Sequence, residues 1–128
     1  MVKASIEIRE RRKVLKKEAR FLLSLILQHP RFPFDVHISN AGIKEWLNQP
    51  HVHYAEKNEA LLILPVLFAE SEYVGPMLDS KNRPDVRYSH IFKVEIAGED
   101  SWIIVHEMIW GEYLVHSVSD SLSPYYNK

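Results

Sequence analysis

The sequence predicts a single α+β domain over residues 1–128, in which a long N-terminal helix and short helices pack on an antiparallel β-sheet meander. Apolar residues recur at three- and four-residue spacing in the first half of the chain, which is the period of an amphipathic helix. The last third changes to β-branched and aromatic stretches separated by short turns, which is typical of strands. A chain of 128 residues, 46% of them hydrophobic, has room for one core, and its zero cysteines exclude disulfide, iron–sulfur and thiol-nucleophile chemistry.

The first part of the chain favours one long helix over residues 4–27, because Ala, Glu, Lys, Arg and Leu dominate it. Residues 1–12 are polar nearly all round and are expected to fray as a basic helix start. The apolar second half must be buried, and we expect it to cover one face of the sheet. Residues 1–20 carry a net charge of +5 and the rest of the chain −6. Such a segment either contacts nucleic acid or forms a solvated helix face, and charge alone does not decide between them.

A strand and a second helix follow. The strand fits residues 34–38, after a proline-rich segment that ends the first helix. Ser39 or Asn40 can cap the second helix, which is predicted over residues 41–48.

A third helix is expected over residues 55–69, and Pro65 should kink or split it. Residues 70–89 are predicted to form a long loop, because Gly, Pro and polar residues dominate them. A loop of that length in a small domain is either functional or mobile.

The last third predicts a three-stranded antiparallel meander over residues 90–96, 101–108 and 112–118. With Gly98 and Glu99 as a two-residue turn, alternate residues fall on two faces of this sheet. The apolar face is expected to hold Phe92, Val94, Ile103, Val105, Leu114 and Val118. The opposite face is expected to hold Lys93, Glu95, Trp102, Ile104, His106, Tyr113, Val115 and Ser117. In this register His106 and His116 point to opposite faces.

The mixed polar and apolar face is the feature that points most directly to chemistry. A carboxylate, an imidazole and a cation on one rigid sheet can cleave RNA without a metal. A base takes the 2′-hydroxyl proton, an acid protonates the leaving 5′-oxygen, and the cation stabilises the charged phosphorane. Glu95 or His106 would be the base, a histidine the acid and Lys93 the clamp. The alternative is a half-exposed sheet face with cross-strand salt bridges.

The chain has seven histidines, and His is the side chain whose protonation is most easily tuned near neutral pH. His51 and His53 lie in the loop between the second and third helices, where they could form the wall of a cleft. With His37 or His106 they could also bind zinc or iron, but no carboxylate stands at a characteristic spacing. We therefore expect no metal and no cofactor.

Several segments resemble the phage-associated barnase/EndoU/colicin/RelE-like nuclease domains. They are residues 34–44, residues 51–54, the helix through Leu64 and Pro65, residues 101–105 and residues 113–117. Domains of that family often stand at the C-terminus of phage head-morphogenesis proteins or polymorphic toxins. The resemblance implies a barnase/RelE-like α+β fold and a bacterial ribonuclease, that is, a hydrolase acting on RNA.

The resemblance also implies roles for individual residues. Lys44 matches the lysine of the family motif, although Glu and Trp follow it where the family has His and Ile. His53 takes the place of the second histidine without the preceding arginine, and Ser117 takes that of the hydroxyl residue at the end of the last strand. Lys44, Lys57 or Lys93 would then have to contact the phosphate in place of the arginine.

Our first hypothesis is a metal-independent endoribonuclease-like domain of phage or mobile-element origin. His53 and His106 would be acid and base, and Ser117 would position the substrate. The other candidate site residues are Glu95 for catalysis and Lys44, Lys93 and His51 for substrate binding.

The second hypothesis is a catalytically inactive interaction module of a phage or mobile element that docks a protein or nucleic acid through its basic helix. The expected partners of the domain are RNA and a protein, such as a phage head or immunity protein. The longest apolar run, residues 21–27, is too short for a membrane span, so no membrane association is expected. The expected location is the bacterial cytoplasm or the virion.

Overall fold

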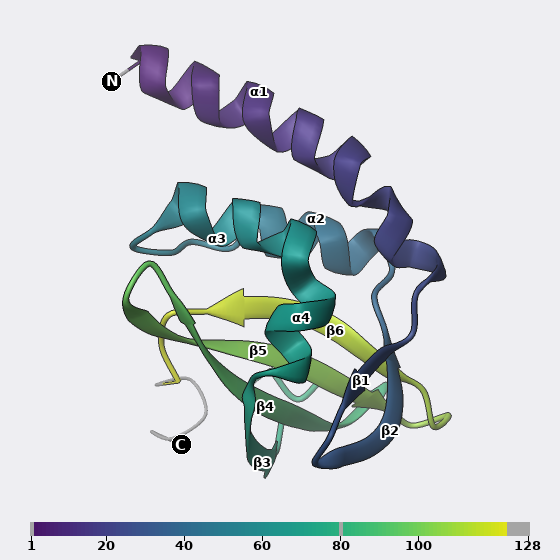
Figure 1. The fold of residues 1–128 in the computed structure, drawn as a ribbon. Coiled ribbons are helices and arrows are strands. Elements are labelled where there is room, and N and C mark those ends of the chain that lie inside the picture. Colours follow the sequence, from purple (N-terminus) through teal and green to yellow (C-terminus); the bar gives the residue numbers. More distant parts are fainter. Residues whose placement is uncertain (1, 80, 123–128) are drawn as a thin grey trace.

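The computed structural model describes residues 2–79 and 81–122, which form a mixed α+β structure of one sheet and several helices (Figure 1). In chain order the elements are α1 (Val2–Glu18), the 3-10 helix η1 (Ala19–Ser24), β1 (Leu27–His29), β2 (Phe32–His37), α2 (Asn40–Asn48), α3 (Tyr54–Ala60), the 3-10 helix η2 (Leu61–Ile63), α4 (Leu64–Ala69), β3 (Glu72–Met77), β4 (Val86–Ile96), β5 (Glu99–Met108) and β6 (Tyr113–Ser119). The predicted α+β class is confirmed.

The sheet has six strands in the order β1-β2-β6-β5-β4-β3. Its centre is the predicted antiparallel meander of β4, β5 and β6. The predicted strand near residue 34 is β2, which pairs with β6 in parallel and so makes the sheet mixed. β1 begins at residue 27, where the sequence predicts the end of the first helix, and β3 lies inside the predicted loop, so the sequence predicts neither strand. β3 contains Gly75 and Pro76, which weaken a strand pattern but are tolerated at the edge of a sheet.

The short helices agree with the sequence. Ser39 is the N-cap of α2, where its side chain accepts a hydrogen bond from the Gly42 N–H at 3.2 Å. The predicted third helix is divided into α3, η2 and α4, with Pro65 in the first turn of α4. Proline is tolerated there because the first turn of a helix has no internal partner for its N–H groups.

The first helix is shorter than predicted and packs elsewhere. The α-helix ends at Glu18, and η1 leads the chain down to β1. α1 lies above α2 and α3 and contacts them, whereas α2, α3 and α4 contact the sheet (Figure 1). The expectation that the first helix covers the sheet is therefore wrong. α4 already occupies that place, with the Phe68 ring 4.6 Å from the Phe92 ring between centroids.

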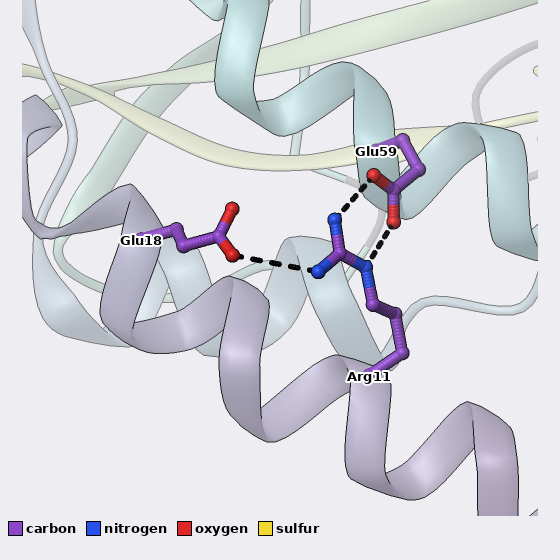
Figure 2. A network of polar contacts seen from close by, with 3 residues as sticks. All are labelled: Arg11, Glu18 and Glu59. Carbon is purple, nitrogen blue, oxygen red and sulfur yellow. Dashed lines mark hydrogen bonds and ion pairs between the residues drawn. The ribbon is translucent and has the colours of Figure 1, made fainter.

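One arginine connects α1 to the layer below. Arg11 donates from Nε and Nη2 to the two carboxylate oxygens of Glu59 on α3, at 2.7 Å each, and reaches Glu18 at 3.4 Å (Figure 2). The hydrogen bond from Arg11 lowers the pKa of Glu59. A two-point contact of this kind sets the orientation of α1 more than its stability, because the side chains are about half exposed.

A reciprocal pair of hydrogen bonds joins α2 to α3 inside the core. The Trp46 indole N–H donates to the Lys57 carbonyl at 2.8 Å, and the Lys57 ammonium donates to the Trp46 carbonyl. Lys57 is fully buried, and its Nζ lies 4.3 Å from the centre of the Tyr54 ring. Burial, together with the nearby charge of Arg12, lowers the pKa of Lys57 to about 7.

We predict that Gly42→Ala reduces the free energy of unfolding by about 1–3 kcal/mol, as overpacking does. A Cβ at this position would stand 2.5 Å from the Val115 carbonyl oxygen and 2.9 Å from Cγ1 of Ile38. Ala41→Ser, on the exposed neighbouring position, is the control and should change stability by about 0.5 kcal/mol or less. Urea unfolding of the two variants measures the difference, and equal stabilities would contradict the close approach of α2 to β6.

Lys57 should make stability depend on pH. Between pH 7 and about 10 the unfolded chain holds the lysine proton and the folded chain does not, so stability rises with pH by up to about 1.4 kcal/mol per unit. Lys57→Met removes the titrating group and should flatten this rise. Urea unfolding at a series of pH values measures it, and parallel profiles for the two proteins would show that the buried lysine stays charged.

Candidate functional site on the outer face of the sheet

The sheet has a helix-covered face and an outer face. On the helix side Phe92, Ile103 and Val105 join the main core. A second, smaller apolar cluster contains Ile91, Ile104 and Trp102 from the alternate positions of the same strands, with Leu122 packed on it. We call the face that carries this second cluster the outer face. It is the mixed polar and apolar face that the sequence predicts.

A β-bulge in β6 brings two histidines together on the outer face. Ile104 pairs with Ser117 and Val105 with Val115, so His116 is the extra residue between them. The rings of His106 and His116 stack with centroids 4.1 Å apart and an angle of 17° between their planes. The prediction that these two histidines point to opposite faces is therefore wrong, because the bulge interrupts the alternation of side chains along β6.

The same bulge changes the faces of the residues before it. Val115 belongs to the core on the helix side, and Tyr113 packs against it. The sequence predicts both residues on the face with Ser117. Leu114 pairs with His106, on the outer face, and not with the apolar set. Val118, beyond the bulge, lies in the helix-side core as predicted.

The connection between β3 and β4 supplies two charges to the histidine pair. Asp79 is 4% exposed and accepts hydrogen bonds from the Arg83 backbone N–H and from Nη1 of Arg83, both at 2.7 Å. Nη2 of Arg83 lies 3.5 Å from Nε2 of His116. Because a guanidinium can only donate, this contact requires a neutral His116 with its lone pair on Nε2. We call Asp79, Arg83, His106 and His116 the histidine cluster.

Two buried polar atoms beside this cluster have no hydrogen-bond partner among residues 2–79 and 81–122. They are Nε2 of His106 and Oγ of Ser89. The two residues face each other across β5 and β4, and both are at least nine-tenths buried. Buried polar groups are normally satisfied, so these two atoms point to a partner from outside the described chain.

The surroundings keep both imidazoles neutral at pH 7. Burial, helped by the neighbouring His116 and Arg83, lowers the pKa of His106 to about 4, against a smaller opposing effect of Asp79. Burial and Arg83 also lower the pKa of His116, while Glu45 of α2 and Asp79 act in the opposite direction. A neutral imidazole can accept a proton, which is what a general base must do.

Some of the candidate residues of the sequence lie near the cluster and others do not. Ser117 is buried opposite Ile104, on the same face as His106. Lys93 pairs with Trp102 and contacts Asp100 at 3.6 Å, and Glu95 pairs with Asp100. Trp102 and Asp100 stand four and six residues before His106 on β5, which is ~13 and ~20 Å along the strand.

His51 and His53 lie on the helix side of the sheet. Nε2 of His51 is 2.7 Å from Oγ of Ser101, whose partner across β4 is the core residue Val94. The His53 backbone N–H donates to Nδ1 of His51 at 2.8 Å. Nδ1 of His53 lies 3.9 Å from Oε2 of Glu56. The sheet therefore separates His53 from His106, and the two do not share a pocket.

Two of the candidate lysines differ in their exposure to solvent. Lys44 is exposed on α2, whereas Lys57 is buried under Tyr54 and cannot contact a phosphate. Within the described part of the chain, no three His, Asp or Glu side chains are arranged to hold a metal ion.

Sequence reasoning missed Asp79, Arg83 and the role of His116. The signal that could have found the first two is the length of the predicted loop over residues 70–89, since long loops in small domains carry function. His116 could not be found from alternation, because a bulge is set by pairing with the neighbouring strand.

The histidine cluster should make the protein less stable at low pH. Between about pH 6.5 and pH 4 the unfolded chain binds a proton at residue 106 that the folded chain does not, so stability falls as the pH drops through this window. His106→Asn removes this titration and should reduce the fall, with little change above pH 7. Chemical unfolding between pH 4 and 8 measures it, and profiles of equal steepness would contradict a neutral, buried His106.

No helix in the described residues is long and apolar enough to cross a membrane. No curated protein and no solved structure is significantly similar to the chain. A family model for the large polyvalent protein-associated domain 3 matches residues 7–119. This match confirms the predicted association with phages and mobile elements and does not support a nuclease family of the barnase/EndoU type. The chain belongs to the large polyvalent protein-associated domain 3 family.

Proposed function

We propose that the histidine cluster binds a phosphate of RNA and cleaves the phosphodiester without a metal. The observation that carries this proposal is the stacked pair of His106 and His116 with the Arg83 guanidinium 3.5 Å from one ring. The unpartnered Nε2 of His106 and Oγ of Ser89 support a ligand at this position. A phosphate offers the acceptor oxygens and the negative charge that such donors bind.

The chemistry divides between the two rings. His116 is the more exposed of the two. When the bound phosphate draws the Arg83 guanidinium away, Nε2 of His116 is free to take the proton from the 2′-hydroxyl, whose oxygen then attacks phosphorus. Arg83 stabilises the negative charge of the phosphorane. His106 gives a proton to the leaving 5′-oxygen, so the products are a 2′,3′-cyclic phosphate and a 5′-hydroxyl.

His106 must be protonated to act as the acid, and in the free protein its low pKa opposes this. The charge of a bound phosphate favours the imidazolium and raises that pKa. Protonation of His106 is thereby coupled to substrate binding. The His106 imidazole stays neutral as long as no phosphate is bound.

The sequence candidates other than His106 take secondary places in this proposal. Ser117 pairs with Ile104, two residues before His106 on β5, and could position the substrate. Lys44 and Lys93 would contact phosphates further along an RNA strand, and Glu95, His51 and His53 stay predictions without a place in the proposed step. The barnase/RelE-like character of the fold also stays a prediction, as do the bacterial cytoplasm or the virion as the site of action.

A second candidate function is an interaction module without catalysis, docking a protein such as a phage head or immunity protein. The observation that favours it is α1, in which Leu15 is the one buried side chain among those described. Ile6 and Ile8 are 50% and 40% exposed there, and Arg9, Arg11 and Arg12 follow them along α1. Such a helix presents apolar and positive surface to a partner.

We expect wild-type protein to cleave single-stranded RNA in EDTA and to leave 2′,3′-cyclic phosphate ends. His116→Ala and His106→Ala should each lower kcat/KM about 10²- to 10⁴-fold, as loss of a general acid or base does. His53→Ala is the control on the other side of the sheet and should retain activity. Gel analysis of labelled RNA measures this. Wild-type protein without cleavage would overturn the proposal, and so would equal cleavage by all three variants.

A further inference from the structure

A hollow lined by basic residues lies at the N-terminal end of α2. It is a hollow of about 410 Å³ between α1, η1 and the start of α2. It is lined by Lys13, Lys16, Lys17, Arg20 and Asn40. We call it the basic hollow. Lys13, Lys16 and Lys17 stand at positions i, i+3 and i+4 of α1 and so share one face of that helix, and Arg20 follows in η1.

The charge of the basic hollow is largely uncompensated. Lys13 contacts Glu10 at 3.3 Å in an exposed pair, and in the described part of the chain no ion pair is recorded for Lys16, Lys17 or Arg20. No carboxylate is among the lining residues. Cations at the end of α1 also stabilise that helix through its dipole, but this effect does not require them to converge on one hollow.

The geometry connects the basic hollow to the histidine cluster through α2. Asn40, at the start of α2, lines the hollow. Glu45, five residues along the same helix, is close enough to His116 for its charge to act on that ring. Five helical residues span ~7.5 Å, so Asn40 at the hollow and Glu45, whose charge acts on His116, are about one and a half helical turns apart. Lys44 is exposed on the same stretch of α2.

We propose that the basic hollow binds the phosphate backbone of the nucleic acid whose cleavage is assigned to the histidine cluster, and this inference rests on that proposed function. The four cations cover ~10 Å of helix, a length over which a nucleic acid presents several phosphates. Lysine acts there as a point charge without a fixed orientation, so the contact adds affinity without reading the sequence. The N-terminal end of α2 adds a partial positive charge at Asn40.

The test uses the full chain and a labelled single-stranded RNA with 2′-O-methyl groups, which cannot be cleaved. Lys16→Gln with Arg20→Gln should weaken binding about tenfold or more, as measured by fluorescence anisotropy. The slope of log K against log salt should fall by about 1.4, since a single strand loses about 0.7 per phosphate contact. Arg9→Gln with Arg31→Gln is the matched control, with the same change of charge at two exposed arginines outside the hollow.

Weaker binding in the hollow variant but not in the control supports the proposal. Equal weakening in the two variants overturns it, because the effect would then come from net charge. Unchanged binding in the hollow variant also overturns it. If that variant loses binding to polyglutamate as strongly as to RNA, the hollow is a site for acidic protein and the proposal fails.

A dinucleotide substrate separates this inference from the proposed function. Its single phosphate is bound at the histidine cluster, so it has no second phosphate for the basic hollow. Its cleavage should therefore be the same in wild-type protein and in the hollow variant. If wild-type protein does not cleave the dinucleotide, the proposed chemistry fails, while the anisotropy comparison still decides whether the hollow binds nucleic acid.

Discussion

The close packing of α2 against β6 is the constraint on which the arrangement of the helices and of the site depends. Gly42 has no side chain to hold the two elements apart, and the Val115 carbonyl fills the space that a Cβ would need. Val115 is also the last paired residue before the bulge that turns His116 to the outer face. The same few residues therefore set the place of α2, the position of Glu45 near His116 and the stacking of His116 on His106.

Two sets of buried polar groups differ in whether their hydrogen bonds are satisfied. Lys57 and Trp46 satisfy each other with two hydrogen bonds and hold α2 and α3 together in the core. His106 and Ser89 leave one atom each without a partner among the described residues. A satisfied pair stabilises the layer of helices, whereas an unsatisfied pair costs free energy that a bound ligand can recover. Asn58, beside Lys57, also has a buried oxygen without a partner among the described residues, but the unpartnered atoms of the outer face stand beside the charged pair of Asp79 and Arg83.

The fold was predictable where the signal is local. The meander, the cap at Ser39 and the break at Pro65 follow from patterns within a few residues. The edge strand β3 and the place of α1 were not predictable in this way. β3 is held by its pairing with β4 in spite of Gly75 and Pro76, and α1 is excluded from the sheet by α4. Both depend on contacts between segments that are distant in the sequence.

By itself the sequence determined the α+β class, the mixed character of the outer face and the presence of His106 and Ser117 on it. The tertiary structure alone decided which second histidine joins them. Alternation along a strand assigns His116 to the wrong face, because a bulge depends on hydrogen bonds to β5 that a single segment does not encode. Asp79 and Arg83 come to the site because β3 pairs with β4 and brings the intervening loop over that face. His53 is kept away because the whole sheet stands between it and His106.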